Sequence, residues 1–195
     1  MSKLFPELIW NFPDHKDTLY LTFDDGPTPV VTPWVLDVLK EYNTKATFFC
    51  LGKNVEKYPD IFERVKSEEH CVGNHGYSHL NGWITRNKVY YSDVERAGGY
   101  IDSRLFRPAF GKIKPSQVHF LKHRYKIVMW NVMSYDFKER ISKEKYLEKL
   151  KKNIKGGSII VFHDTDKAFN KLSYVLPKIL EDPGFKQFKY KSLIY

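Results

Sequence analysis

Cysteine is scarce in this sequence, and its placement indicates neither a disulfide framework nor a thiolate metal site. Only Cys50 and Cys71 occur among the 195 residues, and neither belongs to a Cys-x-x-Cys pair. Small domains held together by disulfides carry many more cysteines. We expect both side chains to be buried thiols, with a bridge between neighbouring strands left open.

Long apolar runs, internal repeats, low-complexity tracts and linkers are also missing. No segment is long and apolar enough to span a membrane, and residues 1–11 lack the apolar stretch of a secretory signal. The expected location is the cytoplasm if the chain is complete, and the cell envelope or the exterior if a signal has been removed. We expect a single domain over residues 1–195.

Acidic residues are outnumbered by basic ones, 23 against 32, which gives a net charge of +9. A basic surface suits anionic partners, but the lysines are scattered along the chain. Their densest stretch, residues 143–155, has the pattern of a solvated helix face, and no nucleic-acid-binding signature accompanies it. We therefore expect no nucleic-acid partner, and the sequence makes no prediction of oligomeric state.

Short apolar runs alternate with longer amphipathic segments, which is typical of an α/β protein with a parallel sheet. Several runs are β-branched or aromatic throughout, as strands covered on both faces should be. Thr32, Asn54 and Ser142 are the expected N-caps of three helices. The expected strands are residues 19–23, 46–51, 71–73, 105–107, 126–130, 158–162 and 188–194.

Polar residues gather where five of these strands stop. In a parallel barrel all such loops meet on one rim, where active sites are built. A doubly wound sheet places its ligand at one switch point and draws on fewer strands. Because a full eight-stranded barrel usually takes about 250 residues, we predict a shortened (β/α) barrel with about seven parallel strands.

Asp24 and Asp25 are adjacent at the end of the first predicted strand. Two neighbouring carboxylates at a buried strand end repel each other, so without a cation one of them would take up a proton. A bound cation removes that problem. An Asp-Gly turn with two solvated acids explains the pair as well, and the pair alone favours the turn.

His75 and His79 are four residues apart, which puts both rings on one face of a helical turn. This spacing is a common way to present two imidazoles to zinc, although a zincin protease would have glutamate where Gly76 stands. Two surface histidines at a coincidental spacing explain the pair equally well.

In combination these residues form a more specific set. One aspartate and two histidines leave a coordination position open for water, as catalytic zinc sites do. The second aspartate offers a base, which Arg107 could keep ionised, and His163 offers an acid on the opposite side. The alternatives are a structural ion pair for Arg107 and a strand-end His163 satisfied by Asp164.

Five segments resemble, in order, the motifs of the polysaccharide deacetylase family, carbohydrate esterase family 4. They are Thr-Phe-Asp-Asp-Gly at 22–26, His-x-x-x-His at 75–79, Arg-Pro-Ala-Phe-Gly at 107–111, Ser-Tyr-Asp-Phe at 134–137 and Val-Phe-His at 161–163. The family includes peptidoglycan and chitin deacetylases and acetylxylan esterases. The resemblance covers nearly the whole chain and implies a distorted (β/α) barrel that forms one polysaccharide-deacetylase-like catalytic domain.

The resemblance implies roles for the residues of the first three motifs. Asp24 corresponds to the general base, a choice over Asp25 that only the family supports, and Arg107 corresponds to its charge partner. Asp25, His75 and His79 correspond to the ligands of one divalent metal. Zinc is expected, and a His₂Asp site also accepts cobalt, nickel or manganese.

The remaining matches concern the acid and the substrate. His163 corresponds to the general acid and Asp136 to the carboxylate that tunes it. The backbone N–H near Phe110 would help to hold the oxyanion. Phe137 and Val161 occupy the positions that line the acetyl pocket.

Three positions depart from the family pattern. Gly76 stands where the family usually has Ser or Thr, whose hydroxyl helps to fix the loop. Phe137 replaces the usual Trp and lacks its indole N–H, and Val161 replaces the usual Leu. The last two changes concern the choice of substrate.

The implied function is that of a metal-dependent hydrolase acting on carbon–nitrogen bonds other than peptide bonds. It would remove the acetyl group from an N-acetylglucosamine-containing glycan, such as peptidoglycan or chitin-type oligomers, with water activated by the metal as nucleophile. Two alternatives remain open at this point. One is an O-acetyl esterase on xylan or another glycan, and the other is a catalytically silent, metal-containing sugar-binding protein.

Overall fold

A curled parallel sheet runs through the computed structural model, which describes residues 6–137 and 142–193. Its strand order is β1-β6-β5-β4-β3-β2-β8-β7, with β9 added beside β2, and every pair is parallel. The strands are Leu8–Ile9 (β1), Thr18–Asp24 (β2), Thr47–Cys50 (β3), Cys71–Asn74 (β4), Leu105–Phe106 (β5), Lys126–Val128 (β6), Val132–Met133 (β7), Ile159–His163 (β8) and Lys189–Tyr190 (β9).

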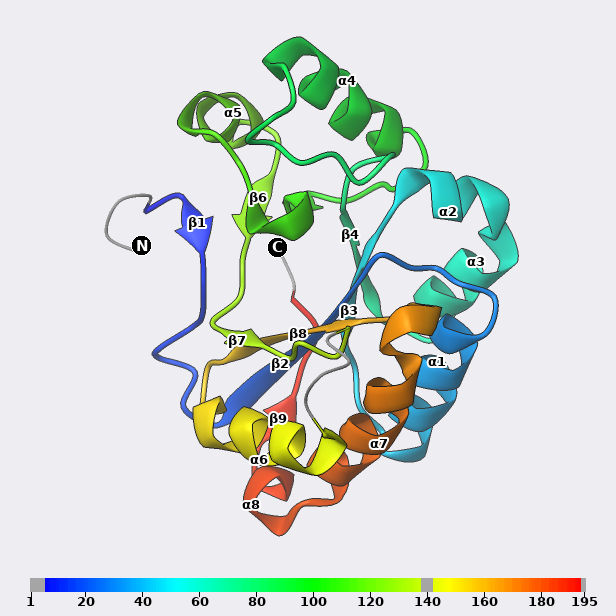
Figure 1. The fold of residues 1–195 in the computed structure, drawn as a ribbon, viewed down its shortest axis with the longest axis vertical. Coiled ribbons are helices and arrows are strands. Elements are labelled where there is room, and N and C mark those ends of the chain that lie inside the picture. The colour runs from blue at the N-terminus through cyan, green and yellow to red at the C-terminus, as the bar shows by residue number, and fades with distance from the viewer. Residues whose placement is uncertain (1–5, 138–141, 194–195) are drawn as a thin grey trace.

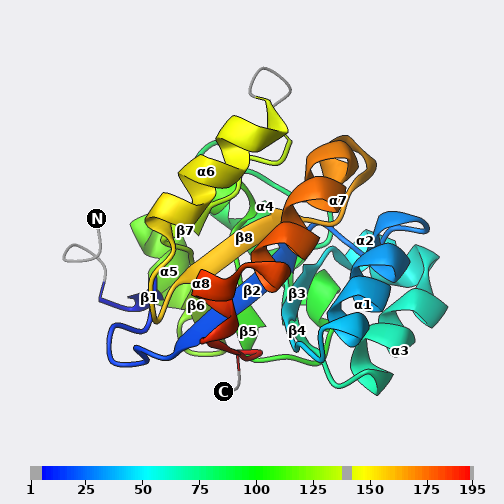
Figure 2. The same ribbon diagram turned by 90° about the horizontal axis from the view of Figure 1, so that it is seen from below.

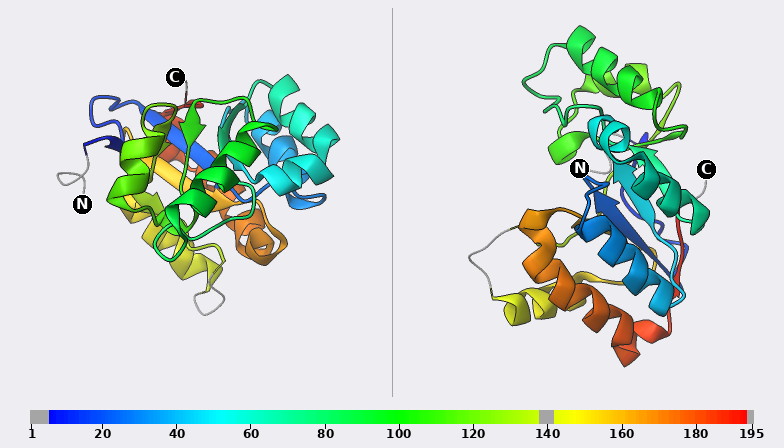
Figure 3. Two further views of the ribbon diagram at one scale, coloured as in Figure 1. Left: turned by 90° about the horizontal axis from the view of Figure 1, so that it is seen from above. Right: turned by 90° about the vertical axis from the view of Figure 1, so that its right-hand side faces the viewer.

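Helices cover the outside of the sheet in three groups, which Figures 1 and 3 show as separate clusters. They are Val31–Glu41 (α1), Gly52–Lys57 (α2) and Pro59–Ser67 (α3); Asn87–Gly98 (α4) and Pro115–Leu121 (α5); and Lys143–Asn153 (α6), Asp166–Glu181 (α7) and Pro183–Lys186 (α8). In Figure 2 the third group lies nearest the reader. Among the described residues, no helix is long and apolar enough to cross a membrane.

The predicted fold class is confirmed, because the sheet curls into a partial, distorted (β/α) barrel that stays open between β7 and β1. Each of the seven predicted strands has a counterpart. The described residues add β1 and β7, whose two-residue length carries no sequence pattern. Only two residues of the predicted strand 188–194 form β9, and residue 194 lies outside the described part of the chain.

One face of the central strand β2 packs on a hydrophobic core, and its other face lines the interior of the partial barrel. Leu19, Leu21 and Phe23 are completely buried in the core between the sheet and its helices. Because side chains alternate along a strand, Thr22 and Asp24 point to the opposite face. The polar end of β2 is thereby directed into the barrel.

Two hydrophobic clusters divide the helices between them. We call the cluster around β2, α1 and α7 the β2 cluster; it includes Leu21, Leu36 and Leu176. The cluster that joins α4 and α5 to β5 and β6, here the α4 cluster, includes Tyr90, Val94, Phe106, Val118 and Ile127. The two clusters thus pack different parts of the same sheet.

Of the three predicted helix caps, only Ser142 is correct. It precedes α6 and accepts a hydrogen bond from a first-turn backbone N–H. The predictions for Thr32 and Asn54 are wrong, because α1 begins at Val31 and α2 at Gly52, so both residues lie inside a first turn. Both side chains instead have tertiary partners near the ends of strands.

Cys50 and Cys71 are free thiols, so the open alternative of a bridge is excluded. Cys50 is buried and Cys71 is half-buried. They lie on neighbouring strands, but the register places Cys71 opposite Thr47 and Cys50 opposite Asn74. The two cysteines are therefore offset by three residues in the strand register and do not lie opposite each other.

Candidate functional site

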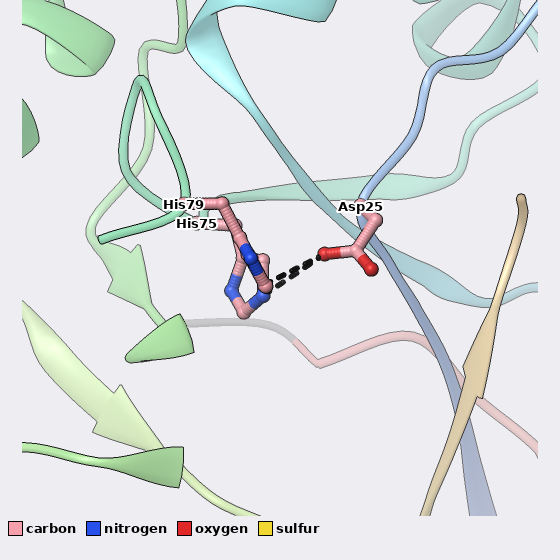
Figure 4. Close-up of side chains that lie close together, drawn as sticks. All are labelled: Asp25, His75 and His79. Atoms are coloured by element: carbon pink, nitrogen blue, oxygen red, sulfur yellow. Dashed lines mark ion pairs between the residues drawn. The ribbon is translucent and has the colours of Figure 1, made fainter. Parts of the chain in front are cut away.

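Three side chains from two strand ends meet at one point. Asp25 follows β2, and His75 and His79 lie in the loop after β4. Asp25 Oδ1 is 3.5 Å from Nε2 of His75 and 3.1 Å from Nε2 of His79. Figure 4 shows the three side chains pointing toward one another. Their ligand atoms lie within 4.8 Å of one another, a grouping that could hold a divalent metal.

The bonding around these side chains fits a metal. Asp25 Oδ1 is buried and has no hydrogen-bond partner among the described residues. His75 Nδ1 donates to the carbonyl of Arg107 at 2.7 Å, so its lone pair belongs to Nε2, which faces Asp25. Burial would raise the pKa of Asp25, but the hydrogen bonds and positive charge that His75 and His79 supply when protonated lower it well below its usual range, and a bound cation would replace that charge. An ionised carboxylate and an oriented imidazole are the forms that bind a cation.

Backbone hydrogen bonds fix the turn that carries Asp25. Its N–H donates to the carbonyl of Phe49 at 3.2 Å, and its carbonyl accepts from Asn54 Nδ2 at 2.7 Å. The next residue, Gly26, is held by the Asp164 carboxylate, which accepts from the Gly26 N–H at 3.0 Å. Any larger residue at position 26 would collide with Asp164. The metal-facing carboxylate therefore sits on a turn anchored from both sides.

The loop that carries the two histidines is held by Asp93 of α4. Its carboxylate accepts from the backbone N–H groups of Tyr77, at 2.8 Å, and Ser78, at 3.0 Å. Gly76 has a φ of +80°, a conformation that would strain the Ser or Thr usual in the family. Asp93 thus fixes the loop in place of that hydroxyl. Asp93 could not be predicted from the sequence, because one acid within an amphipathic helix carries no distinguishing pattern.

Asp24 lies beside the Asp25–His75–His79 group and pairs with Arg107. Arg107 Nη1 donates to Asp24 Oδ1 at 2.7 Å, and both side chains are buried. The other carboxylate oxygen, Oδ2, is 3.9 Å from His75 Nε2 and so faces the candidate metal ligands. One oxygen is therefore held while the other faces the site.

Arg107 is completely buried, and each of its three guanidinium nitrogens donates at least one hydrogen bond. Besides Asp24, it donates to Thr22 Oγ1 at 2.7 Å and to the carbonyls of Val128 and Met129 at 3.2 and 2.9 Å. Its guanidinium also lies 4.1 Å from the ring centroid of Phe49. Burial lowers the pKa of Arg107, and the charge of Asp24 opposes that shift. The sequence predicted this pairing, and the structure adds the network that fixes its geometry.

His163 pairs with Asp136 and stands opposite Asp24 across the β2–β8 register. Its Nδ1 donates to Asp136 Oδ1 at 2.8 Å, and its backbone N–H donates to Oδ2 at 2.8 Å. Burial would lower the pKa of His163, but the Asp136 hydrogen bond and charge raise it to about 9. The ring is therefore protonated at neutral pH. The alternative pairing with Asp164 is wrong, because that carboxylate binds Thr32 Oγ1 instead, at 2.5 Å.

The three predicted substrate-binding residues border this group. The Phe110 ring is 57% exposed, and its centroid lies 4.3 Å from that of His79. The Phe137 ring stands edge-on to His163, with 5.1 Å between centroids. Val161 is buried and pairs with Thr22, two residues before His163 on β8. All ten residues predicted for the site are thus within the described part of the chain and border one region.

Backbone strain is concentrated at this region. Six non-glycine residues among those described have positive φ, and four of them are Asp25 (81°), His79 (59°), Phe110 (59°) and Tyr135 (52°). Such conformations cost free energy and persist where the surrounding contacts impose them. These four are two candidate metal ligands and two aromatic residues that lie beside His79 and Phe137.

Known proteins are similar to this chain in sequence and in fold. The model of a family described as polysaccharide deacetylase matches residues 12–124. A peptidoglycan-N-acetylglucosamine deacetylase of Bacillus cereus is 38% identical over 161 residues, which cover 78% of this chain and 58% of that protein. A second Bacillus cereus protein of the same name is 30% identical over 192 residues, covering 94% and 89%.

The structural comparison agrees with the sequence comparison. The crystal structure of a peptidoglycan N-acetylglucosamine deacetylase has a TM-score of 0.86 and 30% sequence identity, and the match covers 99% of this chain and 94% of that one. The family model spans the first three of the five motifs, and the relatives and this structure cover most of the chain. The chain belongs to the polysaccharide deacetylase family, carbohydrate esterase family 4.

Proposed function

We propose that this chain forms one catalytic domain that removes the acetyl group from N-acetylglucosamine units of a glycan. The observation that carries this proposal is the meeting of three groups at the ends of neighbouring strands. They are the Asp25–His75–His79 group, the Asp24–Arg107 pair and the Asp136–His163 pair. A base and an acid beside a cation site suit hydrolysis of an amide.

Asp25, His75 and His79 would hold one divalent metal, for which we propose zinc. When bound, it would polarise the acetyl carbonyl and lower the pKa of water. Asp25 reaches the site as a carboxylate, and the proton on His75 Nδ1 leaves Nε2 as the ligand atom. Three protein ligands would leave a coordination position open, as catalytic zinc sites do.

Asp24 acts as the general base. Arg107 holds its Oδ1, so that Oδ2 takes the proton from the water that adds to the acetyl carbon. His163 acts as the general acid and gives its Nε2 proton to the departing nitrogen as the carbon–nitrogen bond breaks. An amine leaves poorly unless protonated, and Asp136 keeps that proton on His163 at neutral pH. The products are acetate and the free amino sugar.

Peptidoglycan is the first glycan to test, because both Bacillus cereus relatives are named for deacetylation of its N-acetylglucosamine. Phe110 borders the metal site, and Phe137 and Val161 would line the acetyl pocket beside His163. Phe137 offers an apolar edge and no donor, so we expect it to admit the acetyl methyl without a hydrogen bond.

The decisive experiment measures acetate released from peptidoglycan fragments and N-acetylglucosamine oligomers by the purified protein. Release should stop with a chelator and return with zinc or cobalt. Parallel assays with O-acetylated xylan would distinguish the esterase alternative, since preferential release from xylan contradicts amide hydrolysis as the main reaction. Binding of these glycans without any release, with the metal bound, would instead support a silent sugar-binding protein.

A further inference from the structure

A cavity of about 330 Å³ lies between β7 and α6, and none of the ten site residues lines it. Its volume is at the lower end of the range for ligand pockets. Residues 130–135 form one wall. The other wall is formed by four residues of α6, which are Tyr146, Lys149, Leu150 and Asn153. Because helix residues three and four apart are neighbours, these four share one face of α6. We call this cavity the α6 groove.

The strand wall of the α6 groove is an edge of the sheet, and α6 lies beside it (Figure 2). β7 is the last strand in the sheet order and pairs only with β8 among the described strands. An edge strand presents backbone N–H and C=O groups to which an extended chain can add. The helical wall, from Tyr146 to Asn153, extends over roughly 10 Å, the length of about three residues of extended chain. The groove therefore has the shape for a short, extended peptide.

One hydroxyl of the groove residues is buried without a partner. Tyr146 is 3% exposed, and its hydroxyl has no hydrogen-bond partner in the part of the chain that the structure describes. Burial, reinforced by the charge of Asp136, raises the pKa of Tyr146, so the hydroxyl keeps its proton and can donate. A buried polar group without a partner costs free energy. A carbonyl or carboxylate oxygen of a bound ligand would supply the missing acceptor.

The α6 groove carries a positive charge. Lys149 is the one charged side chain among the residues that line it, and it is exposed. Its ammonium lies 5.7 Å from the ring centroid of Tyr135, and no carboxylate of residues 6–137 or 142–193 forms an ion pair with it. An unpaired cation and a hydroxyl donor on one helix face suit a ligand that bears carboxylates, because hydrogen bonds between charged groups are the strong ones.

One end of the groove adjoins the proposed general acid. Met133 lines the groove and ends β7, and Asp136 follows three residues later. Ser134 also lines the groove, and its hydroxyl accepts from the Asp136 N–H at 3.5 Å. Asp136 in turn holds His163. A substituent of a glycan bound at the catalytic site can therefore enter the groove.

We propose that the α6 groove binds a peptide attached to the glycan, with a peptide carboxylate on Lys149 and a peptide oxygen on the Tyr146 hydroxyl. This inference rests on the proposed function and names its substrate class, a glycan that carries short anionic peptides, as peptidoglycan does. Chitin-type oligomers and xylan carry no such substituent. The groove is then the part of the enzyme that distinguishes peptide-bearing glycans from bare ones.

The test compares kcat/KM on two substrates of equal sugar length: peptidoglycan oligomers with their peptides, and the same oligomers stripped of peptides by an amidase. The wild type should prefer the peptide-bearing substrate by roughly tenfold, the effect of one well-placed charged contact. Lys149→Met should lose this preference and Lys149→Arg should keep it. Tyr146→Phe, which removes only the hydroxyl, should reduce it. Lys152→Met, which changes an exposed lysine of α6 outside the groove, should behave as wild type.

Two results would overturn the groove: equal kcat/KM of the wild type on both substrates, or an unchanged preference in Lys149→Met. Retention on insoluble peptidoglycan, before and after removal of its peptides, supplies a readout that needs no turnover. If the wild type releases no acetate from either substrate, the proposed function fails, and a difference in retention that Lys149→Met abolishes would still support the groove. An equal loss of retention in Lys152→Met would show general attraction of a basic protein and contradict it.

Discussion

Asp24 and Asp25 are adjacent and chemically identical, yet they face different partners. Asp24 is the last residue of β2 and pairs with the buried Arg107. Asp25 leaves the strand with a φ of 81° and turns toward His75 and His79. The chemistry of a carboxylate does not distinguish the proposed base, Asp24, from the proposed ligand, Asp25. The change of backbone direction between them does.

Asp24→Asn should lower kcat for acetate release by roughly 10²–10⁴-fold, the usual contribution of a general base. The amide oxygen can still accept from Arg107, so the buried guanidinium keeps an acceptor and the fold should survive. Thermal unfolding of the variant and its metal content, both near wild type, are the controls. A variant with close to normal kcat would remove Asp24 from the role of base.

The pKa of His163, raised to about 9 by Asp136, predicts an upper pH limit for activity. The protonated acid is present below that value, so kcat should fall as the pH rises through about 9. The ion pair also stabilises the folded state, fully below the ordinary pKa of 6.5, and this contribution is lost as the pH rises through the folded pKa.

Asp136→Asn removes the charge that raises this pKa, so the fall in activity should begin at lower pH. The measurement is a profile of kcat from about pH 6 to about pH 10 for both proteins. A falling limb in the same place for both would show that another group is responsible for it.

At the scale of elements, α4 holds the loop that connects β4 to α4. Asp93 on its second turn accepts from two successive N–H groups of the segment that carries His75 and His79. Hydrogen bonds to a charged acceptor contribute about 1.5–3 kcal/mol. These hydrogen bonds therefore help to fix the positions of the two imidazoles.

Asp93→Ala should therefore weaken zinc binding by roughly tenfold to a hundredfold, the range found when partners of metal ligands are removed. Competition with a chromophoric chelator measures this directly, without catalysis. Glu95→Ala, on the exposed side of the same helix, is the matched control. If Asp93→Ala binds zinc as tightly as Glu95→Ala, the loop does not depend on this carboxylate.

The elements that the sequence predicted well are those whose signal is local. The apolar residues of β2, β3 and β8 are buried, and Asp24 and His163 end β2 and β8. Thr32 and Asn54 were misassigned because tertiary partners, Asp164 and the Asp25 carbonyl, determine what their side chains bind. Asp93 was missed for the same reason, since its partners come from another segment.

At the scale of the whole molecule, the candidate ligands connect separate parts of the sheet. Asp25 extends from β2, whereas His75 and His79 extend from β4, and β3 lies between these strands. A cation held by all three side chains binds the folded chain and not the unfolded one. Metal binding should therefore stabilise the protein as a whole.

Zinc at about 100 times its Kd should add about 2.7 kcal/mol to the free energy of unfolding, which corresponds to a rise in Tm of roughly 5–10 °C for a chain of this size. Thermal unfolding with zinc and with a chelator measures the difference. His79→Ala should lose the shift, and His119→Ala, an exposed histidine of α5, should keep it. An equal shift in both variants would place the stabilising ion elsewhere.

The site draws its candidate ligands from segments packed on two of the three hydrophobic clusters, the β2 cluster and the α4 cluster. Asp25 is carried by a strand of the first, whereas His75 and His79 are carried by a loop that α4 anchors to the second. A bound ion would therefore link segments that pack on different clusters. The affinity for the metal would then depend on how the β2 cluster and the α4 cluster are positioned relative to each other. A cavity made deep in either cluster, far from any ligand, should therefore first weaken metal binding.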